Sequence, residues 1–181
     1  MATTTPKRSM SAAVIAVFVL AGLCVLSVPC VGVLSAVAIP AFVGYVRRSK
    51  TAEVAPNIRA IRGGIEAYAM SERLDPATGS MQPRGLPRSI PLTPATQGAE
   101  RRSWPADADA GWSELGFQIP DPFYFSYEVV TDPATGSVTV RAVGDLDGDG
   151  VTSEFLVDGQ LDAASGEIAW GPGLVITNEL E

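Results

Sequence analysis

The sequence contains no histidine and only two cysteines, Cys24 and Cys30, which lie in one apolar stretch near the start of the chain. The remainder therefore has neither an imidazole nor a thiol. This excludes nucleophiles that pair Ser or Cys with His, and also the usual zinc ligand sets. A disulfide is excluded there too, so other contacts must fix its loops. We interpret both cysteines as small apolar residues of the stretch itself.

Charged residues are also missing between Arg8 and Arg47. This run of 38 positions, 9 to 46, is longer than the roughly 20 residues that span a bilayer. We therefore predict a short basic N-terminus over 1–10 and a transmembrane helix over 11–46. Pro29 and Pro40 each remove a helical hydrogen bond, which predicts a bent or locally loosened helix.

The charges that flank the apolar run leave its orientation in the membrane open. Basic residues lie on both sides, so the positive-inside rule does not choose between the two orientations. They are Lys7 and Arg8 before the run and Arg47, Arg48 and Lys50 after it.

A secretory signal is the alternative reading of this segment, with cleavage after Ala38 in the small-residue sequence Ala36-Val37-Ala38. The mature chain would then be a secreted binding protein that starts at Ile39. Signal sequences have apolar regions of about 7–15 residues. The apolar part from Ser11 to Ser35 has 25 residues, which favours a retained anchor.

The two parts of the chain differ in charge. Residues 1–74 carry a formal charge of +5, whereas residues 75–181 carry −12. A domain with this negative charge and no basic stripe repels phosphate backbones, so we do not expect nucleic acid as a partner. Cations suit it better.

Residues 47–74 show the pattern of an amphipathic helix that continues from the membrane segment. Their apolar residues recur at spacings of 4, 3, 4 and 3, which places them on one helix face. We expect this helix to run to about Arg73 and to cover a sheet. The predicted packing face consists of Val54, Ile58, Ile61, Ile65 and Tyr68.

Proline dominates the next region, 75–122, which holds 8 of the 14 prolines and predicts an irregular loop. Its later apolar residues, Trp104, Trp112, Leu115 and Phe117, are expected to fold back onto the core.

The C-terminal region, 123–181, alternates β-branched and aromatic runs with Gly, Asp and Pro, which predicts a small antiparallel sheet and the α+β class. The expected strands cover 123–130, 137–143, 152–157 and 166–170. The sequence DPATGS occurs at Asp75 and again at Asp132, and DAASGE at Asp162 is similar. We interpret all three as turns.

Between two of these strands, GDLDGDGVTSEF places Asp145, Asp147 and Asp149 at alternate positions before Gly150. This is the opening of an EF-hand type calcium loop, since clustered carboxylates repel one another unless a hard cation lies among them. The twelfth loop position is Leu156 rather than glutamate, and Glu154 lies two residues earlier. We predict a calcium-binding hairpin loop with the three aspartates as ligands and Glu154 as a fourth. An ordinary Asp-Gly turn with solvated charges is the alternative.

Several of these motifs together resemble type IV pilins and type II secretion pseudopilins. They are AVAIPAF, then SKTAE after a basic cluster, then an amphipathic helix, a loop and a small sheet. WSELGF, DPFYFSYE, AVGDLDGDG and the terminal NELE resemble a pilin-like set from myxobacteria and other delta-type proteobacteria. The resemblance covers about 35–181. It implies a long N-terminal helix packed on an antiparallel sheet, and a calcium loop near the sheet.

The resemblance further implies a single-pass protein of the bacterial inner membrane. Its globular domain would be periplasmic or extracellular, and its helix could assemble with like or unlike subunits as a filament or pseudopilus component. The prepilin cleavage motif and its glutamate are absent. In the two possible registers, Leu23 or Val14 occupies the position of that glutamate. We expect a non-enzymatic structural or adhesive envelope protein.

The alternative from another class is a membrane-tethered hydrolase that uses carboxylates as an acid/base pair. The candidates are Asp107, Asp109 and Glu114 in the proline-rich region. An enzyme of this kind would bring its carboxylates together in one deep pocket.

Overall fold

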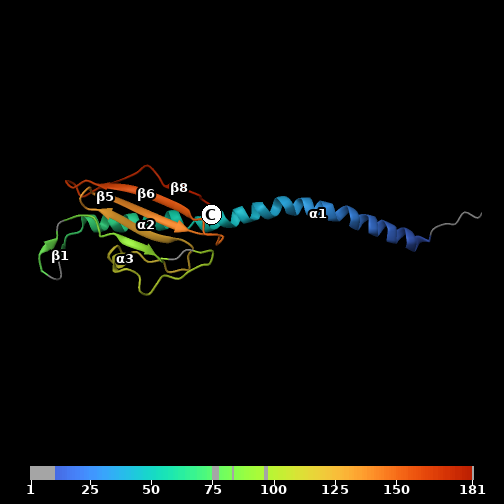
Figure 1. The fold of residues 1–181 in the computed structure, drawn as a ribbon, viewed down its shortest axis with the longest axis horizontal. Helices are drawn as coiled ribbons and strands as arrows, with labels where there is room; N and C mark the ends of the chain where they lie inside the picture. The colour runs from blue at the N-terminus through green and yellow to red at the C-terminus, as the bar shows by residue number, and fades with distance from the viewer. Residues whose placement is uncertain (1–10, 75–77, 83, 96–97, 181) are drawn as a thin grey trace, which may run out of the picture. The chain divides into compact units, whose positions relative to one another are not determined.

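The computed structural model describes residues 11–74, 78–82, 84–95 and 98–180. Its contacts divide the chain into two units, Met1–Tyr45 and Val46–Glu181. Helix α1 (Ala12–Thr51) forms the described part of the first unit and supplies the first residues of the second. Among the described residues, the second unit holds the remaining helices and every strand (Figure 1).

In the first unit, α1 exposes apolar side chains on all sides, such as Phe18 at 66%, Val33 at 68% and Val37 at 70%. By length and composition, the helical stretch that starts at Val31 is apolar enough to cross a membrane, and its apolar part is not buried. The helix runs through Pro29 and Pro40, and the predicted bend at these residues stays a prediction.

In the second unit, helix α2 (Val54–Met70) packs its apolar face on the core. Four of the five predicted face residues are buried, and Tyr68 is half-buried at the margin. Ala69 is completely buried in the last turn.

The helix is not continuous from 47 to 74, because a turn at Ala52 and Glu53 separates α1 from α2. Pro56 has no N–H to donate to the carbonyl of Ala52, so an uninterrupted helix would lack that hydrogen bond. The helix also ends at Met70 rather than about Arg73. Arg73–Leu74 instead form strand β1, which pairs with β2 (Met81–Gln82).

An antiparallel sheet of six strands lies against α2 and confirms the α+β class (Figure 1). The strand order is β3-β4-β5-β6-β7, and β8 also pairs with β6. Four strands match the predicted runs: β4 (Ser126–Asp132), β5 (Ser137–Gly144), β6 (Ser153–Leu161) and β7 (Ile168–Trp170). Strand β8 (Val175–Thr177) was not predicted.

The proline-rich region is not a loop throughout. Strand β3 (Ile90–Thr93) forms one edge of the sheet, where Ile90 pairs with Val129 of β4. An edge strand tolerates Pro91 because one of its sides needs no hydrogen bond. The short helix α3 (Ala110–Glu114) follows later in the region.

The core between α2 and the sheet contains the aromatic residues that the sequence placed there. Trp112 is 1% exposed, and its indole N–H donates to Thr93 Oγ1 at 2.9 Å. Trp104 packs edge to face against Trp112 and Phe117, with ring centroids 5.7 and 5.5 Å apart. The predicted return of this segment to the core is confirmed.

The DPATGS sequence at Asp132 and the DAASGE sequence at Asp162 both form turns, as predicted. At the first turn, Asp132 Oδ1 accepts the N–H of Ala134 at 3.0 Å and Oδ2 accepts the Thr135 hydroxyl at 2.8 Å. Asp162 makes the equivalent bonds, and Gly136 and Gly166 have φ of +75° and +77°. These hydrogen bonds lower the pKa of both carboxyls. Residues 75–77 of the other copy lie outside the described residues.

Substitutions at the adjacent glycines Gly63 and Gly64 of α2 can test how closely this helix approaches the end of α3. A Cβ on Gly64 would lie 2.4 Å from the carbonyl oxygen of Leu115, whereas a Cβ on Gly63 would meet nothing within 4 Å. We expect Gly64→Ala to lower the free energy of unfolding by about 1–3 kcal/mol through overpacking. Gly63→Ala should leave it unchanged or raise it by up to about 1 kcal/mol. Denaturant unfolding of the full chain in detergent measures both, and equal effects would contradict the close contact.

Candidate functional site

The turn between β5 and β6 brings three acidic side chains together. Asp145, Asp147 and Asp149 each offer a carboxylate oxygen, and these oxygens lie within 4.8 Å of one another. Asp145 is 7% exposed at the end of β5, whereas the other two are exposed. Gly148 and Gly150 have φ of +81° and +89°, which allows the chain to turn back twice within six residues.

Hydrogen bonds within the turn fix the carboxylates. Asp145 accepts the N–H of Gly148 at 2.6 Å and that of Gly150 at 3.2 Å, one on each oxygen. Asp149 Oδ1 accepts the N–H of Val151 at 2.7 Å. The backbone therefore curls around Asp145, the innermost of the three carboxylates.

The separation of the oxygens suits a divalent cation. Calcium binds oxygen ligands at about 2.3–2.6 Å, so two ligands on opposite sides of the ion lie about 4.6–5.2 Å apart. A spread of up to 4.8 Å fits inside one such shell. The three aspartates could therefore hold a metal ion, as carboxylates are the ligands that hard cations prefer.

The predicted fourth ligand, Glu154, is not part of this group among the described residues. It lies in β6, and its carboxylate forms an ion pair with Arg141 of β5. Arg141 also donates to Glu128 of β4 at 2.6 Å. Glu154 is thus bound by the guanidinium of Arg141 on the sheet. The sequence spacing had instead suggested that it is a ligand of the acidic loop.

Two basic residues of α1 contact the acidic turn, and the sequence analysis did not pair them with it. Arg47 Nη2 donates to Asp147 Oδ2 at 2.6 Å and Nη1 to the carbonyl of Leu180 at 2.7 Å. Lys50 Nζ donates to the carbonyl of Leu146 at 2.9 Å. The basic cluster RRSK at 47–50 and the acidic loop carry opposite charges, which is the sequence signal for this contact. The sequence alone does not show which of these charges meet.

The helix junction contacts the start of the sheet close to the same turn. Glu53 Oε1 accepts the N–H groups of Tyr124 and Phe125 at 2.8 and 2.9 Å. The ammonium of Lys50 lies 4.7 Å from the centroid of the Tyr124 ring, and Arg102 donates to the Tyr124 carbonyl at 2.6 Å. The acidic turn is therefore attached to a junction that is itself fixed by hydrogen bonds.

The carboxylates proposed for a hydrolase lie in two different hollows. Asp107 and Asp109 line one of about 460 Å³ with Pro91 and Pro105, and Glu114 lines another of about 690 Å³. Asp109 is the N-cap of α3, where it accepts the N–H of Gly111 at 2.8 Å and pairs with Arg88.

Comparison with protein-family models, with curated proteins and with solved structures gives no match for this chain. The geometry of the described residues therefore carries the functional argument.

The Arg88–Asp109 pair predicts a stability effect at low pH. The hydrogen bond from Arg88, followed by that from the Gly111 N–H, holds the pKa of Asp109 below its usual value. A carboxyl with a lowered folded-state pKa stabilises the fold above its unfolded pKa, and this contribution is lost as pH falls through the folded value. We expect Asp109→Asn to lower the unfolding free energy by up to about 1 kcal/mol at neutral pH, and the difference to vanish as pH falls through the lowered pKa of Asp109.

The neighbouring Asp107 provides the control for this measurement. It is exposed and has no hydrogen-bond or ion-pair partner among the described residues. Asp107→Asn should follow the wild type at every pH in thermal unfolding of the full chain. A constant offset for Asp109→Asn down to pH 2 would mean that the charge of Asp109 contributes nothing.

Proposed function

We propose that the chain is a pilin-like, membrane-anchored envelope protein with a structural or adhesive role and no catalytic activity. The observation that carries this proposal is the combination of two elements along one chain. A helix with unburied apolar residues precedes a second helix whose apolar face is packed on an antiparallel sheet. The first suits lipid or a bundle of like helices, and the second builds a stable module.

Anchoring follows from the cost of exposing the first unit to water. Large apolar side chains such as Leu20, Leu34 and Ile39 are 62–69% exposed, and burying each is worth about 1.5–3 kcal/mol. We place the globular unit outside the cytoplasmic membrane, as the resemblance to pilins implies. The same helix could associate with further copies or with related subunits in a filament or pseudopilus.

Calcium is the ion we propose for the acidic turn. Three carboxylates and turn carbonyls are hard oxygen ligands, and water would complete a shell of 6–8. Arg47 neutralises part of the negative charge through Asp147, so the affinity should resemble that of extracellular calcium modules, about 10⁻⁴–10⁻³ M. Bound calcium would fix the β5–β6 turn in a globular unit that has no cysteine.

Membrane anchoring is tested by replacing two apolar residues of α1. We expect the full chain to stay with bacterial membranes during alkaline carbonate extraction. Val33→Arg with Val37→Arg should release it, because two central arginines oppose insertion by about 5–7 kcal/mol. Arginines at the exposed Val151 and Val175 of the globular unit are the control.

The mass of the extracted chain distinguishes the readings of its N-terminus. A start at Met1 or Ala2 is expected for an unprocessed anchor, and a start at Met10 would indicate pilin-type processing. A chain that starts at Ile39 and stays in solution would contradict anchoring.

Calcium binding is tested by thermal unfolding of the full chain in detergent, before and after addition of millimolar calcium. At the proposed affinity, 1 mM calcium is about 1–10 times the Kd and stabilises the folded state by about 0.4–1.4 kcal/mol. For a chain of this size, that raises the Tm by about 1–6 °C. Asp145→Asn and Asp149→Asn should each remove the shift.

The control for charge is Asp107→Asn, which should retain the full shift because Asp107 lies outside the group of three aspartates. Magnesium at the same concentration should give a smaller shift, because it needs near-octahedral geometry. An unchanged Tm of the wild type with calcium would contradict the proposed ion.

A further inference from the structure

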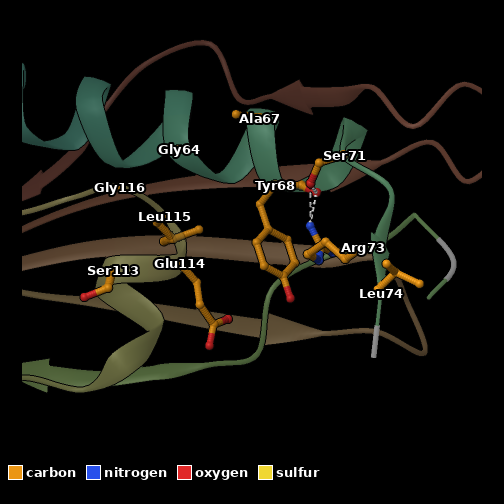
Figure 2. Close-up of a pocket in the computed structure, with 10 residues that line it drawn as sticks. All are labelled: Gly64, Ala67, Tyr68, Ser71, Arg73, Leu74, Ser113, Glu114, Leu115 and Gly116. Atoms are coloured by element: carbon orange, nitrogen blue, oxygen red, sulfur yellow. Dashed lines mark hydrogen bonds between the residues drawn. The ribbon is translucent and has the colours of Figure 1, made fainter. Parts of the chain in front are cut away.

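The hollow that Glu114 lines, at the C-terminal end of α2, shares no residue with the acidic turn. It has a volume of about 690 Å³ and lies between α2, β1 and α3 (Figure 2). Pockets that hold small ligands have volumes of about 300–1,000 Å³. Its polar side chains include Tyr68, Arg73, Ser113 and Glu114, and Leu74 and Leu115 supply apolar surface.

Arg73 forms a fixed wall of this hollow. Its Nη1 donates to the carbonyl of Tyr68 at 2.5 Å and to the hydroxyl of Ser71 at 2.7 Å. Its guanidinium carbon lies 3.3 Å from the centroid of the Tyr68 ring. These contacts engage the positive charge with the last turn of α2, whose carbonyls favour a cation. They also fix the plane of the Tyr68 ring.

Three other polar groups of the hollow have no such contacts. The Tyr68 hydroxyl, the Ser113 hydroxyl and the Glu114 carboxylate have no hydrogen-bond partner among the described residues that line it. Figure 2 shows the Tyr68 hydroxyl and the Glu114 carboxylate extending in the same direction. The carboxylate only accepts hydrogen bonds, whereas each hydroxyl both donates and accepts.

These groups favour an uncharged ligand with many hydroxyls. An anion would meet the carboxylate of Glu114 and two arginines that are already engaged. Arg73 is bound to the end of α2, and Arg88, which interacts electrostatically with Glu114 and Tyr68, is paired with Asp109. A cation would be attracted by Glu114 but would meet the Arg73 guanidinium on the other wall. The hydroxyls of a neutral sugar can donate hydrogen bonds to the carboxylate, and they can both donate to and accept from the hydroxyls of Tyr68 and Ser113. Its C–H face can lie on Leu74, which is 65% exposed.

We propose that this hollow binds a neutral sugar unit, with Glu114 as the principal acceptor of its hydroxyls and Tyr68 as a second contact. The proposal deepens the adhesive role proposed above and rests on it for biological context. The ligand class would be a neutral polysaccharide or glycan of a surface.

The location within the globular unit agrees with such a role. Helix α2 starts near the junction with α1 and has 17 residues, so its C-terminal end lies about 25 Å from its start at 1.5 Å per residue. The hollow therefore lies at the end of α2 away from the residues that follow the proposed anchor.

Sugar binding is tested with the full chain in an amine-oxide detergent, because alkyl glycoside detergents carry neutral sugars themselves. The probes are the methyl glycosides of glucose, galactose and mannose, and maltose, with glucuronate and glucosamine as charged counterparts. Saturation-transfer NMR and calorimetric titration should detect at least one neutral probe at millimolar concentration. Charged counterparts should bind more weakly.

Glu114→Gln and Tyr68→Phe should each weaken that binding, Glu114→Gln by up to about tenfold because the group that accepts the sugar hydroxyls loses its charge. Glu100→Gln, an exposed carboxylate outside the hollow, should leave it unchanged. An equal Tm for all three variants shows that the fold is intact.

The proposal is overturned if no neutral probe binds, if only the charged probes bind, or if both variants bind as the wild type does. The carbonate extraction and the calcium shift depend on α1 and on the acidic turn. Failure of sugar binding is therefore distinguishable from failure of the proposed function.

Discussion

The burial of one face of α2 on the sheet is the constraint on which the remaining structure depends. Val54, Ile58, Ile61 and Ile65 are at most 2% exposed, and each contributes about 1.5–3 kcal/mol by leaving water. This packing fixes the rotation of α2 and places Tyr68 at the hollow at its C-terminal end. Arg47 and Lys50 precede the turn at Ala52 and Glu53, and the hydrogen bonds of Glu53 to Tyr124 and Phe125 hold that junction on the sheet.

The acidic turn depends on contacts from both sides. Its own backbone surrounds Asp145, and Arg47 and Lys50 contact it from α1. The junction that carries these basic residues is fixed in turn by the bonds of Glu53 to Tyr124 and Phe125. A cation at the aspartates would join an arrangement that the protein already holds together.

Local patterns predicted much of this fold. The spacing of apolar residues identified α2, the β-branched runs identified four strands, and the alternating aspartates identified a turn whose carboxylates do meet. Features set by contacts between distant residues were missed. Strand β3 is an edge formed by pairing with β4 despite Pro91, and Glu154 is bound by Arg141. The hollow beside Tyr68 exists only where α2, β1 and α3 meet.

The ion pairs described above all join an arginine to a carboxylate: Arg47 to Asp147, Arg88 to Asp109, and Arg141 to Glu128 and Glu154. Arginine stays protonated at any ordinary pH, and the chain has no histidine to titrate near neutrality. The arginine partner of each contact therefore keeps its charge into strongly alkaline surroundings. Ionic strength, which screens exposed charges over about 8–10 Å, is the property of the medium that can weaken them. Near neutral pH, a globular unit built in this way is therefore expected to respond more to salt than to acidity.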